Sequence, residues 1–166
     1  MTDMSTPETT PPRGGAPVGF LSELPPVEAG AVLCLRQWCD GAEGRRRMSQ
    51  DFAAALGSRS GEAAIRAFED LCDLCTRHGR RPLMRHHLGC KCLGADEACF
   101  ANFIAAASEG SREDALLFAT LIVRADMAPW LAHLAETFGL SLRRMAATPA
   151  HGPATETGSG LPRTLH

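Results

Sequence analysis

Apolar residues recur every three or four positions between residue 27 and residue 146. This spacing places them along one face of an α-helix, and no segment shows the strict alternation that indicates a strand. Glycine and proline divide the pattern into segments that are each long enough for a helix. We therefore predict an all-α, single-domain bundle of five to seven helices. The predicted helices cover residues 27–39, 45–57, 60–79, 95–110, 111–125 and 126–139, with one or two further turns after the last.

The segment 60–79 has the clearest helical pattern. Ser60 can cap its first turn, and Gly79 can end it in a left-handed conformation. The apolar face of this helix already contains two cysteines, Cys72 and Cys75. These thiols can converge on a metal only if another segment folds back onto that face.

The next segment, residues 80–94, has no helical pattern and contains a proline and two glycines. A connection of this length is less common than a tight turn and is more often functional. It includes the stretch RHHLGCKCLG at 85–94, which holds two imidazoles, two thiols and the only lysine of the chain. We therefore expect the function to depend on this connection.

The two ends of the chain lack the helical pattern. Residues 1–26 and 147–166 are rich in proline, threonine and glycine. Such segments bury too little apolar surface to offset the entropy lost on ordering. We expect both to be disordered tails on a helical domain that spans residues 27–146.

The composition agrees with a small helical protein. With 166 residues the chain has room for one domain, and its 5% aromatic content without tyrosine favours closely packed helices over a sheet. The formal charge of −2 gives no general attraction for nucleic acid, so an anion site would have to be local. The N-terminus lacks the basic start and apolar run of a secretory signal, and no segment is apolar enough to span a bilayer. We expect a cytoplasmic protein without membrane contact.

Seven cysteines are present, and an odd number in a reducing compartment argues against a disulfide framework. Zinc is commonly bound by two close pairs of ligands that a turn brings together. Two such pairs flank the connection, so the sequence predicts a candidate zinc site, and an iron–sulfur cluster is a less favoured occupant. The predicted ligands are Cys72, Cys75, Cys90 and Cys92, with Cys99, His78, His86 and His87 as substitutes.

The same cysteines also fit a protein that binds no metal. Free cysteine is among the residue types most often buried, and it packs as a small apolar side chain. Cys72, Cys75 and Cys99 can therefore be ordinary core positions in an alanine-rich bundle. This alternative stays open on the sequence alone.

A run of cations surrounds the second cysteine pair, and no acidic residue occurs between Thr76 and Ala95. Cations near Cys90 and Cys92 would stabilise their thiolates and make them redox-responsive. The same cations could bind an oxyanion or an acidic partner surface, because arginine binds oxyanions bidentately. They could also simply pair with acids on neighbouring helices. The cations are Arg77, Arg80, Arg81, Arg85 and Lys91.

The segment LAHLAETFGLSLRRM at 131–145 is similar to the first half of a helix-turn-helix. The resemblance implies that Gly139 makes the turn and that Ser141 caps the next helix. Only about two turns of helix remain after Ser141, which is short for a recognition helix. In a DNA-binding regulator, the contacts would come from Ser141, Arg143 and Arg144.

Catalysis has less support than binding. The chain has no glycine-rich phosphate loop, no G-x-S-x-G elbow and no H-E-x-x-H helix. A nucleophile pair of Cys90 and His87 has no assignable orienting group or oxyanion donor. We therefore expect a regulatory or partner-binding protein, in which metal binding or oxidation of Cys90 or Cys92 alters a surface for a protein partner. A DNA-binding regulator and a purely structural helical protein are the alternatives.

Overall fold

The computed structural model describes residues 13–148, and the two ends of the chain lie outside the described residues. The part described folds into six α-helices, which confirms the prediction of an all-α bundle. None of these helices is both long enough and apolar enough to cross a bilayer. The helices are α1 Pro26–Cys39, α2 Ala42–Leu56, α3 Ser58–His78, α4 Ala95–Glu109, α5 Arg112–Ile122 and α6 Ala128–Ala147.

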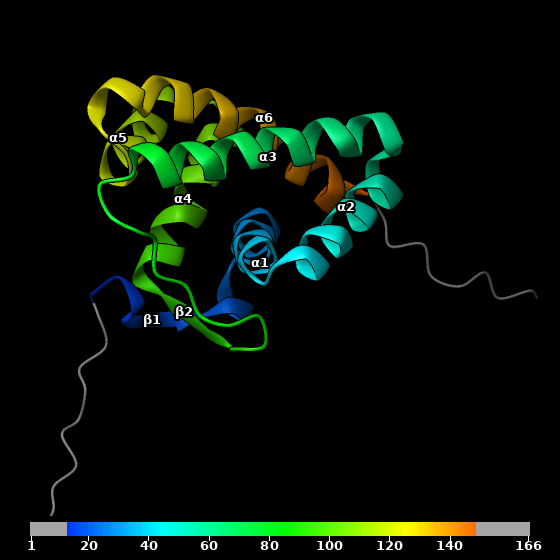
Figure 1. Cartoon of the computed structure of the whole chain (residues 1–166), viewed down its shortest axis with the longest axis horizontal. Helices are drawn as coiled ribbons and strands as arrows, with labels where there is room; N and C mark the ends of the chain where they lie inside the picture. Colours follow the sequence, from blue (N-terminus) through cyan, green and yellow to red (C-terminus); the bar gives the residue numbers. More distant parts are fainter. Residues whose placement is uncertain (1–12, 149–166) are drawn as a thin grey trace, which may run out of the picture.

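Helix α6 packs against each of the other five helices, and it runs alongside α3 in Figure 1. Four phenylalanine rings lie close together here, one from α6 and one from each of three other helices. The ring of Phe138 on α6 lies 4.6 Å from that of Phe68 on α3 and 5.9 Å from that of Phe52 on α2. The ring of Phe100 on α4 lies 6.5 Å from that of Phe68. These buried rings supply much of the apolar surface that holds the helices together.

The ends of α3 differ from the prediction. Gly57 ends α2 with a φ of +82°, which glycine adopts without strain, and α3 then begins at Ser58, two positions before the predicted cap Ser60. Gly79 does not take the predicted left-handed conformation, because its φ is −61°. The chain leaves α3 extended and forms an antiparallel bridge between Gly79 and Val123.

The predicted N-terminal tail is wrong for residues 13–26. This stretch forms two short 3-10 turns and the strand β1 (Pro17–Phe20), which pairs antiparallel with β2 (Cys92–Gly94). This two-stranded sheet is a small addition to the all-α bundle, and the local pattern did not indicate it. The stretch lies below α1 and α4 in Figure 1 and is ordered because it packs on a second, small apolar cluster. This cluster consists of Val32, Leu93 and Ala101, with Leu21, Leu24 and Ala98 packed against it.

The predicted helix-turn-helix is wrong, because α6 continues without a break through Gly139 to Ala147. A Cβ atom at Gly139 would lie 2.8 Å from the Cβ of Ser108 and 2.9 Å from the carbonyl oxygen of Ile104 on α4. The glycine therefore permits close contact between two helices and makes no turn. Ser141 caps no helix either, since it is buried and its hydroxyl bonds to the carbonyl of Thr137 at 3.2 Å.

Candidate functional site

The connection between α3 and α4 is non-helical over residues 80–91, as predicted. It is held by the two acidic residues in the first turn of α4, Asp96 and Glu97, which are both buried. Acidic residues in the first turn of a helix favour the positive end of its dipole. The structure gives them a second role, because their carboxylates accept hydrogen bonds from the connection.

Asp96 binds the first half of the connection. Arg81 forms a bidentate pair with it, with Nη1–Oδ2 and Nη2–Oδ1 distances of 2.6 and 2.7 Å. The main-chain N–H of Met84 donates to the same carboxylate at 2.8 Å. The hydrogen bonds from Arg81, together with that from Met84, lower the pKa of Asp96.

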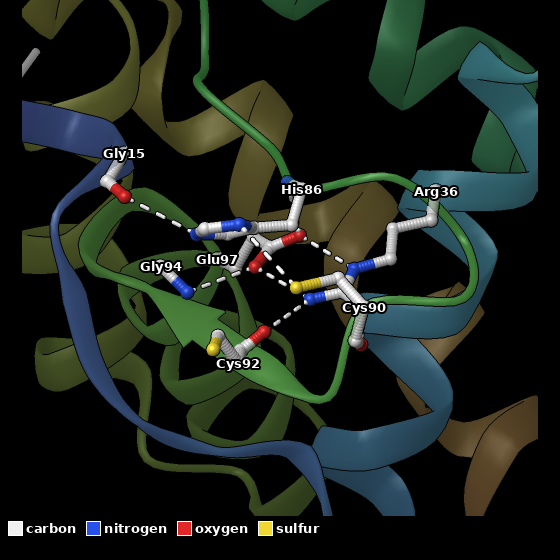
Figure 2. A network of polar contacts seen from close by, with 7 residues as sticks. All are labelled: Gly15, Arg36, His86, Cys90, Cys92, Gly94 and Glu97. Atoms are coloured by element: carbon white, nitrogen blue, oxygen red, sulfur yellow. Dashed lines mark hydrogen bonds and ion pairs between the residues drawn. The ribbon is translucent and has the colours of Figure 1, made fainter. Parts of the chain in front are cut away.

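Glu97 binds the second half of the connection and pairs with Arg36 of α1 (Figure 2). The Nε–Oε1 and Nη2–Oε2 distances are 2.7 and 2.9 Å, and neither side chain is exposed. Glu97 also accepts from the N–H groups of His86 and Gly94, at 3.0 and 2.9 Å. Burial by itself raises the pKa of Glu97, but the hydrogen bonds from Arg36 and the two N–H groups outweigh burial and lower it.

The remaining donors of Arg36 reach the cysteine pair. Nη1 donates to the carbonyl of Cys90 at 2.6 Å, and Nη2 donates to that of Cys92 at 2.7 Å (Figure 2). Arg36 thus ties α1 to α4 and to the backbone of both cysteines. Sequence reasoning missed this residue. The one available signal is its position one turn after Val32, on the side of α1 that is otherwise apolar and buried.

Cys90 is paired with His86, and the pairing with His87 considered from the sequence is wrong. The Sγ of Cys90 lies 3.7 Å from Nδ1 of His86, while His87 is exposed. Nε2 of His86 lies 3.1 Å from the carbonyl oxygen of Gly15, at the N-terminal end of the described chain (Figure 2). The ordered N-terminal stretch therefore orients the imidazole that faces the thiol.

The cations do not lower the pKa of Cys92 as predicted. A hydrogen bond with the Cys90 thiol raises the pKa of Cys92, and the nearby charge of Arg36 opposes this effect without reversing it. Cys92 therefore favours its thiol form.

The structure does not gather the predicted zinc ligands into one site. Across residues 13–148, no three His, Cys, Asp or Glu side chains are placed to hold a metal ion together. Cys72 and Cys75 lie on α3, on the wall of a cavity, and burial raises the pKa of Cys75 to about 12. Cys99 and His78 are half-buried and complete no cluster. Binding of zinc or of an iron–sulfur cluster stays a prediction without support from this geometry.

A cavity of about 610 Å³ lies between α1, α3 and the connection. Its apolar lining consists of Leu35, Trp38, Leu71, Pro82, Leu83 and Phe100. Three thiols also line it, those of Cys39, Cys72 and Cys75. Four arginines complete the wall, namely Arg45, Arg80, Arg81 and Arg85. Among the described residues that line this cavity, none is acidic.

Three of these arginines bond only to neutral groups within residues 13–148. Arg80 donates to the carbonyl of Thr120 at 2.6 Å, and Arg85 donates to that of Cys39 at 3.1 Å. Arg45 lies over the ring of Trp38, with its guanidinium carbon 4.1 Å from the ring centroid. Their positive charge is therefore available to a ligand, whereas that of Arg81 is paired with Asp96.

The other predicted cations lie away from the cavity. Arg77 forms an exposed pair with Asp73 at 3.2 Å, and Lys91 is exposed beyond the lining. Arg143 and Arg144 are exposed near the end of α6. The predicted anion-binding set is therefore split, and only its members on residues 80–85 face one cavity.

Comparison with known proteins identifies no relative of this chain. No family model matches it, and searches of curated proteins and of solved structures find no match either. No residue role is therefore transferred from another protein, and the cavity and the connection are interpreted from their own chemistry.

Proposed function

We propose that this protein binds a small organic anion with an apolar body in the cavity between α1, α3 and the connection. One observation carries the proposal: arginines whose charge has no carboxylate partner lie beside an apolar wall. The volume of about 610 Å³ lies within the range of roughly 300–1,000 Å³ that small-molecule sites occupy.

Each half of such a ligand has a matching surface. Its apolar body would lie against Leu71, Leu83 and Phe100, where the loss of water contact stabilises the complex. Its acidic group would accept hydrogen bonds from guanidinium groups, which bind carboxylate, sulfonate and phosphate oxygens strongly. A neutral ligand of the same shape would gain only the stabilisation that comes from burial of its apolar body.

Ligand binding also offers a route to regulation. Arg80, Arg81 and Arg85 belong to the connection, so a bound anion would draw that segment towards α1 and α3. A change of this kind would alter the outer surface of the connection, which is where we expect a protein partner to bind. The regulatory role, the protein partner and the cytoplasmic location stay predictions. The DNA-binding alternative loses its main support because α6 makes no turn.

Two fluorescent probes of similar shape test the proposal. 1-Anilinonaphthalene-8-sulfonate has an aromatic body and a sulfonate, and N-phenyl-1-naphthylamine has the same body without the charge. We expect the sulfonate to bind the unmodified protein about tenfold more tightly or better. The double variant Arg45→Gln and Arg85→Gln should lose this preference while its affinity for the neutral probe is unchanged.

The matched control is Arg66→Gln, which removes an exposed arginine of α3 that does not line the cavity. This variant should bind both probes like the unmodified protein, and circular dichroism should show that every variant is folded. Equal affinity of the two probes, or an unchanged preference for the sulfonate in the double variant, would contradict the proposal.

A further inference from the structure

We propose that Cys90 and Cys92 form a reversible disulfide when a hydroperoxide oxidises Cys90, with His86 accepting the Cys90 proton. This site does not include the cavity, and the inference does not depend on the proposed ligand. It assigns a chemical activity to the thiol-bearing turn of the connection.

The hydrogen bond to Gly15 determines the state of the His86 ring. A carbonyl oxygen only accepts hydrogen bonds, so Nε2 of His86, 3.1 Å from the Gly15 oxygen, must bear a proton. In the neutral ring Nδ1 is then the nitrogen with a free lone pair. This nitrogen faces the Sγ of Cys90 at 3.7 Å and can accept its proton. His86 is therefore oriented as a base towards the thiol (Figure 2).

Arg36 supports the second requirement, which is that the two cysteines stay close together. It holds the carbonyls of Cys90 and Cys92 at 2.6 and 2.7 Å with its two terminal nitrogens. Cys90 and Cys92 are two positions apart in the chain, so their Cα atoms are separated by at most about 7 Å, close to the separations that disulfides bridge. Both side chains are half-buried, so a small oxidant can reach them. We expect a rotation of the two side chains, with both carbonyls still bonded to Arg36, to bring the sulfurs into bonding distance.

The chemistry takes place in two steps. In the first step the Cys90 thiolate attacks the outer oxygen of the hydroperoxide, an S–O bond forms and the O–O bond breaks. The sulfur is oxidised, the peroxide is reduced to an alcohol, or to water in the case of hydrogen peroxide, and the proton held by His86 goes to the leaving oxygen. In the second step Cys92 attacks the sulfenic sulfur of Cys90, the S–S bond forms and water is released. A dithiol reductant then reduces the disulfide by thiol–disulfide exchange, which restores both cysteine thiols and oxidises the reductant to its own disulfide.

The other described thiols lack this arrangement. Cys34 and Cys72 are buried, and Cys39 is exposed without an imidazole partner. Cys90 is the one cysteine of residues 13–148 that the structure places against a histidine ring. It should therefore be the first thiol to react.

Peptide mapping after treatment of the full chain with hydrogen peroxide tests the inference. Trypsin cleaves after Arg85, Lys91 and Arg112, so the peptides 86–91 and 92–112 stay joined only if Cys90 is bridged to a cysteine of the second peptide. We expect the joined peptides in the oxidised protein and separate peptides after treatment with dithiothreitol. The second peptide also contains Cys99, so the variant Cys99→Ser should retain the bridge and Cys92→Ser should lose it.

Two histidine variants test the role of the base. His86→Gln keeps an N–H group that can donate to the Gly15 carbonyl but removes the base, and we expect it to slow oxidation about tenfold or more. His87→Gln is the matched control and should react like the unmodified protein. A bridge that persists in Cys92→Ser, addition of oxygen without a bridge, or equal rates in the two histidine variants would overturn the inference. Thermal unfolding of each variant shows whether it is folded.

Discussion

Arg36 and Glu97 are 61 positions apart in the sequence, and their side chains meet at 2.7 Å with no exposure of either to solvent. The pair joins the last turn of α1 to the first turn of α4. Arg36 also bonds to two carbonyls of the connection, and Glu97 accepts from two of its N–H groups. A single ion pair therefore holds both the helices and the thiol-bearing turn in place.

Replacement of Arg36 by methionine should destabilise the protein strongly. It leaves the carboxylate of Glu97 buried without its charged partner, and two carbonyls of the connection lose their donors. We expect the free energy of unfolding to fall by about 3–5 kcal/mol. Urea denaturation followed by circular dichroism measures this change.

The control for this experiment is Arg66→Met. Arg66 pairs with Glu62 at 3.0 Å, but both side chains are more than two-thirds exposed, at 68% and 72%. An exposed pair of this kind contributes about 0.5 kcal/mol or less. Equal losses of stability in the two variants would contradict a structural role of the buried pair.

Stability should decrease in acid because the pKa values of Glu97 and Asp96 are lowered in the folded protein. A group whose pKa is lowered by folding binds more protons in the unfolded chain, so stability rises with pH. The stabilisation is complete above the ordinary pKa values of 4.5 and 3.8, and it is lost as the pH falls through the lower values of the folded state. Urea denaturation at a series of pH values measures this loss.

Glu97→Gln and Asp96→Asn identify the source of the acid effect. Each variant removes one titrating carboxyl, so the free energy of unfolding should depend less on pH than in the unmodified protein. Glu28→Gln, in the first turn of α1, serves as the comparison. An unchanged pH dependence in both variants of α4 would show that the acid effect arises elsewhere.

Gly139→Ala should destabilise the protein although alanine favours helix formation. The added Cβ would lie 2.8 Å from the Cβ of Ser108 and 2.9 Å from the carbonyl oxygen of Ile104, so α4 and α6 must separate. We expect a loss of about 1–3 kcal/mol in the free energy of unfolding.

Gly30→Ala provides a matched comparison within α1. There the added Cβ would meet only the end of the Leu142 side chain, at 3.3 Å, and that methyl group can move. Alanine contributes up to about 1 kcal/mol over glycine in a helix, so this variant should be neutral or more stable. A Gly139→Ala protein as stable as Gly30→Ala would contradict the close helix contact.

Iodoacetamide should label Cys39 well before Cys34 and Cys75 in the folded protein at about pH 8. Cys39 is exposed. Burial raises the pKa of Cys75 to about 12, and burial together with the charge of Asp51 raises that of Cys34 to about 12. The reactive thiolate is therefore about a thousandfold rarer at Cys34 and Cys75 than in a cysteine with the ordinary pKa. Peptide mass mapping over time measures the order of labelling, and in urea the three cysteines should react at similar rates.

The local pattern predicted most of the helices because periodicity and chain breakers act over a few residues. The ends of α2, α4 and α5 each lie within three positions of the predicted ends. The pattern failed where a distant partner decides the outcome. Strand β1 forms only because Cys92–Gly94 lies beside it, and Gly139 stays helical because α4 packs closely against it.

The candidate site could also be predicted only in part from the sequence. The sequence directed attention to residues 80–94 and to three arginines that do line the cavity. It missed Arg36 and Glu97, because a buried ion pair is recognised only when both partners are seen together. It also paired Cys90 with the wrong histidine, since the carbonyl that orients His86 comes from Gly15.

The sequence by itself determined the helical class of this protein, the order of its helices and the position of its long connection, because these depend on local spacing of apolar residues, glycine and proline. Only the tertiary structure decided which thiol faces an imidazole, which arginines lack a carboxylate partner and how α6 passes through its glycine. Those features depend on contacts between segments that are far apart in the chain, and no local pattern encodes such contacts.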